Sequence, residues 1–198
     1  MNQNHAELCP SPEWAAYLHK DVLPALCDGL ELGPRMLEIG PGPGASAEWL
    51  RHRVQQLVAV ELEEETVAAL RERFAGTNVE VQHGDATRLP FDEGSFDSVG
   101  TFTMLHHVPT PALQNQVFAE ALRVLRPGGT MIGSDSIPST GLHDFHVGDV
   151  YNPVDPATLI TRLQTVGFGA ITVSVDYGFT FRARKPDPQR DGVWEHAS

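Results

Sequence analysis

Short apolar runs alternate with longer stretches of helical periodicity from residue 35 onward. Several of the short runs are too apolar to alternate between a polar and an apolar face, which is typical of parallel strands covered on both sides. Strands are expected at 35–39, 57–61, 78–82, 96–102 and 129–135. Helices are expected at 45–54, 63–76, 111–126 and 155–168. This alternation predicts right-handed crossovers and a doubly wound, Rossmann-like α/β sheet.

The amino-terminal region departs from this alternation. One long helix is expected from about Glu13 to Asp28, with Ser11 as its cap and Gly29 closing it. Pro24 falls inside the helix and lacks the backbone N–H that an interior turn uses. A kink, or a break into two shorter helices, is therefore expected at Pro24.

The carboxyl-terminal region also departs from it. Residues 170–176 and 179–185 read as two strands joined by a tight turn, which predicts an antiparallel hairpin at the sheet edge. Because no repeat or linker interrupts the chain, residues 1–198 are interpreted as a single domain. Within it, 1–32 is interpreted as a helical lid region and 136–154 as a substrate-facing insert.

Composition narrows the classes of partner. The 198 residues carry a formal net charge of −12, which argues against nucleic acid and anionic membranes as partners because phosphate groups attract clustered cations. We find neither a secretory signal nor an apolar run long enough to span a bilayer. Cys9 and Cys27 form neither a disulfide framework nor a metal motif. A cytoplasmic protein is expected, and the sequence leaves open whether it is a monomer or a homodimer.

The segment "MLEIGPGPG" at 36–44 predicts a nucleotide-binding turn after the first strand. Pro41 and Pro43 each remove an N–H that a pyrophosphate would need. Glu38 stands just ahead of the loop, where its charge would repel phosphate and attract a cation. The pattern therefore favours an adenosine ligand with positive charge, such as S-adenosylmethionine, over a dinucleotide.

Acidic residues after the next two strands agree with an adenosine ligand. Glu61 ends the second strand, near the spacing at which an acid reaches ribose hydroxyls. It could instead be one more acid at a helix start, as Glu63, Glu64 and Glu65 are expected to be. Asp85 follows the third strand and could accept a hydrogen bond from an adenine amino group, or could simply cap a turn.

At this point the chain resembles the class I S-adenosylmethionine-dependent methyltransferases, methyltransferase type 11 group, which includes quinone-biosynthesis C-methyltransferases. The matching pieces, in order, are "LEIGPGPG", "VAVEL", "GDATRLPF", "FDSVGTFTMLHHV" and "LRVLRPGG". The resemblance implies a seven-stranded, mostly parallel sheet whose last strand is inserted antiparallel. The cofactor-binding residues that it implies are Glu38, Gly40, Pro41, Gly42, Gly44, Glu61, Leu62, Asp85, Ala86 and Thr101.

The histidines are candidates for contact with the methyl acceptor. His106 ends the fourth strand, and His143 lies in the 136–154 segment, so both are tentative catalytic residues. His143 and His146 are three residues apart near Asp144 and Asp149, but nothing in the sequence shows that these groups converge, so no metal site is predicted. Ordinary loop packing is the alternative for each histidine. Trp14 and Tyr17 could be a buried helix face or could roof the pocket.

These observations predict a methyltransferase that acts on a small molecule, by carbon or oxygen methylation. Only the lid region and the 136–154 segment are left to recognise an acceptor, and both are short. Two alternatives stay open: a non-catalytic protein that binds S-adenosylmethionine, and an NAD(P)-dependent oxidoreductase, which Pro41, Pro43 and Glu38 disfavour.

Overall fold

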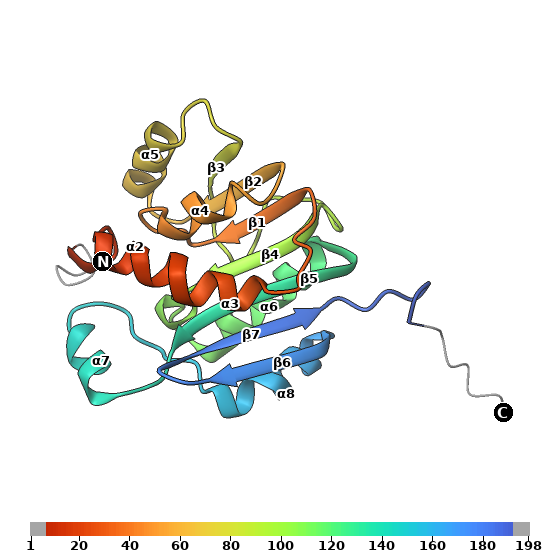
Figure 1. Ribbon diagram of the computed structural model, residues 1–198. Coiled ribbons are helices and arrows are strands. Elements are labelled where there is room, and N and C mark those ends of the chain that lie inside the picture. Colours follow the sequence, from red (N-terminus) through yellow and green to blue (C-terminus); the bar gives the residue numbers. More distant parts are fainter. Residues whose placement is uncertain (1–6, 192–198) are drawn as a thin grey trace.

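The computed structural model describes residues 7–191 and is built around one seven-stranded sheet of order β3-β2-β1-β4-β5-β7-β6 (Figure 1). The strands are β1 Arg35–Ile39, β2 Gln56–Glu61, β3 Val79–His83, β4 Phe96–Phe102, β5 Leu125–Ser136, β6 Gly169–Val175 and β7 Gly178–Arg184. Strands β1 to β5 pair in parallel, whereas β7 pairs antiparallel with both β5 and β6. The expected fold, including the inserted antiparallel last strand, is confirmed.

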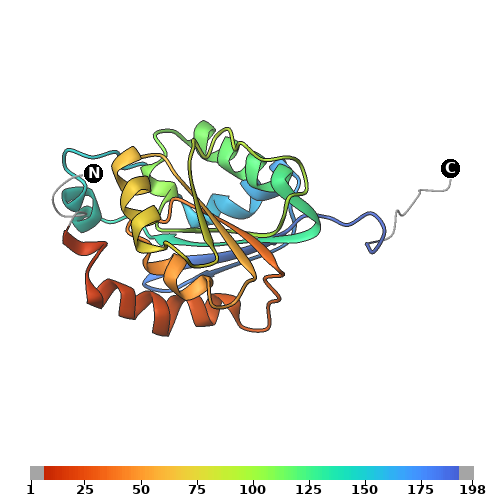
Figure 2. The ribbon, with the colours of Figure 1, turned by 90° about the horizontal axis from the view of Figure 1, so that it is seen from above.

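Helices cover both faces of the sheet. The helical segments are α2 Pro12–Tyr17, η1 Leu18–Val22, α3 Leu23–Cys27, α4 Ala45–Leu50, α5 Glu64–Arg73, η2 Leu105–His107, α6 Pro111–Val124, α7 Thr140–Phe145 and α8 Pro156–Val166. In β1, Leu37 faces the core shared with α6 and α8, and Met36 faces the core shared with α2 to α5. Figure 2 shows the amino-terminal helices (red) and α6 (green) on opposite sides of the sheet.

The amino-terminal helix is continuous, and the distortion expected at Pro24 takes the form of a π-helical turn. Segment η1 widens the helix just before Pro24, so that the chain continues into α3. The Ser11 hydroxyl accepts a hydrogen bond from Trp14 N at 3.1 Å, as expected for the cap. Residues 1–6 of the expected lid region lie outside the described part of the chain.

Several segments differ from the sequence-based expectation. Strand β5 begins at Leu125 rather than at residue 129, so helix α6 ends at Val124 rather than at residue 126. Helix α4 ends at Leu50 rather than near residue 54, and the Arg53 guanidinium donates to the Trp49 carbonyl at 2.8 Å. The 136–154 segment, for which no periodicity was found, contains the short helix α7, capped by the Ser139 hydroxyl. Among residues 7–191, each helix falls short of the length and apolar character that crossing a membrane requires.

Candidate active site

A cavity of about 480 Å³ opens at the carboxyl ends of the parallel strands, and we call it the cradle cavity. Its walls come from the loop after β1, the end of β2, the segment 84–87 and the end of β4. Trp14 and Leu18 close it from the amino-terminal helix, and Asp149 and Val150 from the segment after α7. These segments lie on one side of the molecule, where the arrowheads of β1 and β4 point (Figure 1).

The glycine loop leaves room for a ligand at Gly42. Its backbone has φ +54°, and a Cβ built there would have no heavy atom within 4 Å. A Cβ at Gly44 would instead lie 2.8 Å from the Phe74 ring. Packing against Phe74 therefore requires a glycine at position 44. At Gly42 the absence of a side chain leaves space in the cavity for a ligand.

Glu61 turns its carboxylate toward the same loop. Its Oε2 accepts from Gly42 N at 3.2 Å, and its Oε1 accepts from Leu62 N at 2.7 Å. These backbone donors fix the carboxylate between the loop after β1 and the start of α5. It can therefore accept hydrogen bonds from a diol bound in the cavity.

Glu38 is buried directly behind the loop. One oxygen accepts a hydrogen bond from the Ser46 hydroxyl, and among the described residues the other oxygen, Oε2, has no hydrogen-bond partner. The pKa of Glu38 is raised to about 7: burial raises it most, the Ser46 hydrogen bond lowers it, and the nearby Glu61 charge raises it by a smaller amount. A cationic ligand close to Glu38 would stabilise its ionised form.

Asp85 and Thr101 complete the predicted set. The Asp85 Oδ1 accepts from Thr87 N and from the Thr87 hydroxyl, both at 2.8 Å, so this carboxylate does cap a turn and is held in place by it. Thr101 is fully buried in β4, and its hydroxyl has no partner among the described residues. Although its carboxylate caps this turn, Asp85 lines the cradle cavity.

The structure brings most of the predicted cofactor-binding residues together. Seven of the ten line the cradle cavity: Gly40, Pro41, Gly42, Glu61, Leu62, Asp85 and Ala86. Glu38, Gly44 and Thr101 lie behind this wall. Sequence reasoning missed Cys9, which also lines the cavity, and left Trp14 undecided between a buried face and the cavity roof that it forms. Tyr17 is exposed.

Next to the cavity, His106 is held by Asp135. Both side chains are buried, and His106 Nδ1 lies 2.6 Å from Asp135 Oδ1. The other carboxylate oxygen accepts from His106 N at 3.2 Å. The expectation that His106 ends the fourth strand is wrong, because β4 ends at Phe102 and His106 lies on η2, the short helix that follows. Asp135 lies near the end of β5. The adjacent ends of two paired strands thus position this pair.

His143 does not join His106. It is exposed on α7, and its ring centroid lies 6.3 Å from that of Tyr151. His146 instead packs against His106, with ring centroids 4.9 Å apart, and stacks on Tyr151 at 4.2 Å. Burial lowers the pKa of His146.

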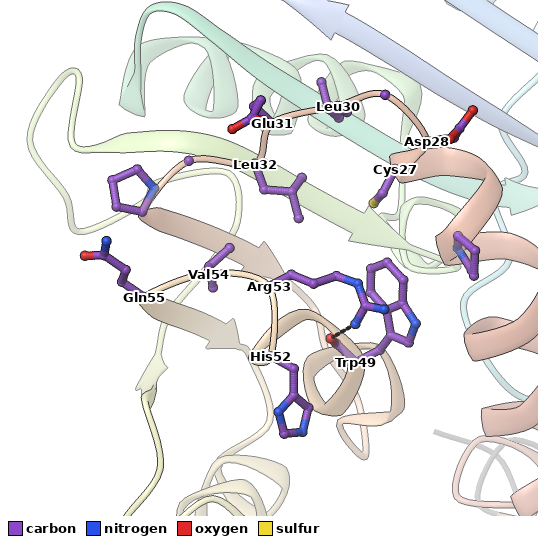
Figure 3. A pocket seen from close by; sticks show the side chains of 14 residues that line it. Cys27, Asp28, Leu30, Glu31, Leu32, Trp49, His52, Arg53, Val54 and Gln55 are labelled. Carbon is purple, nitrogen blue, oxygen red and sulfur yellow. Dashed lines mark hydrogen bonds between the residues drawn. The ribbon is translucent and has the colours of Figure 1, made fainter.

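A second hollow, of about 870 Å³, lies at the opposite ends of the strands (Figure 3). We call it the amino-end hollow because Gly33 and Pro34 precede β1, and Val54 and Gln55 precede β2. The Arg53 guanidinium lies 3.1 Å from the centroid of the Trp49 ring, and burial raises the pKa of the Cys27 thiol to about 11. The Arg53 guanidinium thus stacks on a neighbouring side chain rather than facing a ligand.

The strand order, the inserted antiparallel strand and an acid at the end of β2 define the class I methyltransferase fold. Residues 37–133 match the family model described as "Methyltransferase domain". A protein of Pyrococcus horikoshii, PH0226, superposes with a TM-score of 0.77 at 20% identity, covering 93% of this chain and 99% of that one. The chain belongs to the S-adenosylmethionine-dependent methyltransferases of the type 11 group.

Three relatives match parts of the chain, and the names of two of them imply different acceptors. A "Probable S-adenosylmethionine-dependent methyltransferase" of Mycolicibacterium smegmatis is 31% identical over 69% of this chain and 52% of its own length. A demethylmenaquinone methyltransferase of Clavibacter sepedonicus is 39% identical over 50% and 40%. A ribosomal RNA small subunit methyltransferase A of Geobacter metallireducens is 45% identical over 35% and 26%. The chain spans about half, or less, of the length of these relatives.

The residues present fit S-adenosylmethionine, the cofactor of this class. The cofactor carries an ammonium and a sulfonium, and the buried Glu38 oxygen, which has no partner within residues 7–191, supplies negative charge beside the loop. The open space at Gly42 and the fixed Glu61 carboxylate supply room and acceptors for the rest of the molecule.

Proposed function

We propose that this protein catalyses methyl transfer from S-adenosylmethionine to a carbon or oxygen atom of a small molecule. The observation that carries the proposal is the convergence of Gly42, Glu61 and Asp85 on one cavity at the carboxyl ends of the strands. A protein that only binds the cofactor would share this convergence. Catalytic turnover is therefore proposed in addition to cofactor binding.

Each cofactor-binding residue has a proposed part. Glu38, Gly40, Pro41, Gly42 and Gly44 surround the methionine end, with Glu38 as the counter-charge. Glu61 and Leu62 hold the ribose, Asp85 and Ala86 the adenine, and Thr101 lies beneath the transferred methyl. The burial of Glu38 and the positions of Glu61 and Asp85 on the cavity wall support these parts.

On the acceptor side, His106 is the proposed catalytic contact. Asp135 fixes its ring, and the neighbouring His107 lines the cradle cavity. His143 is proposed as an outer contact for the acceptor, since α7 belongs to the segment that follows β5. When bound, S-adenosylmethionine supplies an already activated methyl group. The chain's own residues then contribute alignment of the acceptor and exclusion of water.

A small-molecule acceptor agrees with the apolar lining of the cradle cavity and with the net charge of the chain. Trp14, Leu18, Met104 and Val108 form apolar parts of the wall, as in most small-molecule sites. A net charge of −12 disfavours ribosomal RNA, which would need cations on the protein surface. We place the protein in the cytoplasm, in keeping with Cys9 and Cys27 being free thiols.

Parallel calorimetric titrations with S-adenosylmethionine, S-adenosylhomocysteine and NADH test the proposal. We expect micromolar binding of the first two and none of NADH. In Glu61→Ala the affinity for S-adenosylhomocysteine should fall about 100-fold, because two charge-assisted hydrogen bonds to the ribose are lost. Glu65→Ala is the matched control, since Glu65 is an exposed acid of the same run, in the first turn of α5. Binding of NADH alone would contradict the proposal.

A further inference from the structure

Three histidines gather beside the cradle cavity, and we call them the histidine cluster: His106, His107 and His146. One ring nitrogen of each lies within 4.8 Å of the others. His106 and His107 come from η2, whereas His146 comes from the residue that follows α7. The cluster therefore exists only because the 136–154 segment folds back over the end of β4.

Hydrogen bonds orient two of the three rings. His106 Nδ1 donates to the Asp135 carboxylate, which places the lone pair of the neutral ring on Nε2. His146 Nδ1 lies 2.5 Å from the Leu142 carbonyl, which can only accept, so the lone pair of His146 also lies on Nε2. A carboxylate and a backbone carbonyl on the second ring nitrogen are the outer contacts that metal-binding histidines usually have.

We propose that His106, His107 and His146 bind a divalent transition-metal ion, of the zinc class, beside the cradle cavity. Three imidazoles suit Zn²⁺, Co²⁺ or Ni²⁺ rather than Mg²⁺ or Ca²⁺, which prefer oxygen. Zinc–nitrogen bonds are about 2.0–2.1 Å, so the rings must close slightly from their present spacing. His107, the only half-buried member, has the freedom to turn.

The position of the site indicates a class of acceptor, and this step rests on the proposed function. His107 and Asp149 line the cradle cavity, so a metal held there would have open positions facing the bound ligands. Three protein ligands with an open position are typical of catalytic rather than structural zinc. A hydroxyl acceptor that binds there loses its proton to solvent, keeps the electron pair on oxygen, and becomes a stronger nucleophile. Oxygen, rather than carbon, is then the atom methylated.

Titration of the full-length, metal-free protein with Co²⁺ tests the site, with S-adenosylhomocysteine present. We expect one Co²⁺ per chain, with visible absorption bands that disappear when Zn²⁺ is added. His107→Ala and His146→Ala should each weaken Co²⁺ binding at least about tenfold. His52→Ala is the matched control, because His52 is an exposed histidine at the amino-end hollow, and it should leave binding unchanged.

Binding of S-adenosylhomocysteine, measured without metal on each variant, reports folding and separates the two proposals. If the His146→Ala variant does not bind S-adenosylhomocysteine, it is taken as misfolded, and the Co²⁺ affinity of His107→Ala alone tests the metal site. Lack of a Co²⁺ complex, or equal Co²⁺ affinity in wild type and His107→Ala, would overturn the metal site while leaving the proposed function standing. Conversely, Co²⁺ binding that needs the cluster in a protein without affinity for S-adenosylhomocysteine would support the metal site and contradict the proposed function.

Discussion

The two hollows of the molecule lie at opposite ends of the same strands, and the smaller one is the functional candidate. The amino-end hollow measures about 870 Å³ and the cradle cavity about 480 Å³. Side chains after β1, β2 and β4 converge on the cradle cavity, because parallel strands bring their carboxyl ends to one edge of the sheet. The cradle cavity is therefore distinguished from the amino-end hollow by the functional groups that converge on it, and not by its volume.

The two hollows differ in whether their polar side chains have interaction partners within the protein. At the amino-end hollow, Arg53 stacks on Trp49 and donates to its carbonyl (Figure 3). Behind the cradle cavity, a Glu38 oxygen and the Thr101 hydroxyl are buried without partners among the described residues. An unpaired buried polar group costs stability, so its presence indicates a ligand that supplies the missing partner.

The largest difference between the two hollows is expected when a glycine in each is replaced by alanine. Gly42 (φ +54°) lies in the cradle cavity and Gly29 (φ +65°) in the amino-end hollow, and a Cβ at either would have no heavy atom within 4 Å. Each substitution should cost about 1 kcal/mol of unfolding free energy, because both residues have left-handed backbone conformations. Only Gly42→Ala should weaken S-adenosylhomocysteine binding, by about 10- to 100-fold, since its methyl group enters the ligand's space.

Calorimetric titration together with urea denaturation of both variants measures these effects. Equal loss of affinity in Gly29→Ala and Gly42→Ala would mean that backbone strain, rather than the cradle cavity, is responsible.

The next largest expected effect is the change of cofactor affinity with pH, as Glu38 ionises. Because burial raises the pKa of Glu38 to about 7, the carboxyl is mostly protonated at pH 6 and mostly ionised at pH 8. S-adenosylmethionine, a cation, should favour the ionised form, so its affinity should rise about tenfold between these pH values. Glu38→Gln should remove the rise, and titrations at both pH values would show it.

The stability of the ligand-free protein should move in the opposite direction. Between the ordinary carboxyl pKa of 4.5 and about 7, the folded state binds more protons at Glu38 than the unfolded state. The Glu38 contribution therefore favours the folded state below this window and is lost as the pH rises through it. Urea denaturation from pH 5 to 8 should show a shallower fall in Glu38→Gln; an unchanged slope would contradict the assigned pKa.

The smallest expected effect is at the amino-end hollow. Arg53→Gln removes the stacking on Trp49 and a hydrogen bond, and should lower the unfolding free energy by about 1 kcal/mol. The affinity for S-adenosylhomocysteine should stay within about twofold of wild type, because no charge near the cradle cavity changes. A larger loss in calorimetric titration would indicate that the two hollows are coupled.

Local sequence was sufficient for the strands and the cradle cavity, but not for the acceptor side. Strand 96–102 and the "LEIGPGPG" turn have their chemistry within a few consecutive residues, so pattern and spacing predict them. The His106–His146 contact joins residues 40 positions apart through a segment without periodicity. Cys9 and Trp14 reach the cavity only because the amino-terminal helix packs across one face of the sheet. Such contacts depend on tertiary packing, which spacing along the chain does not encode.

Hydrogen exchange with and without S-adenosylhomocysteine tests most directly which hollow binds the cofactor. We predict slower amide exchange on ligand addition in 40–44, 61–64 and 84–87, and no change in 28–34 or 52–55. Protection at the amino-end hollow, with unchanged exchange in the cradle loops, would contradict the assignment of the site.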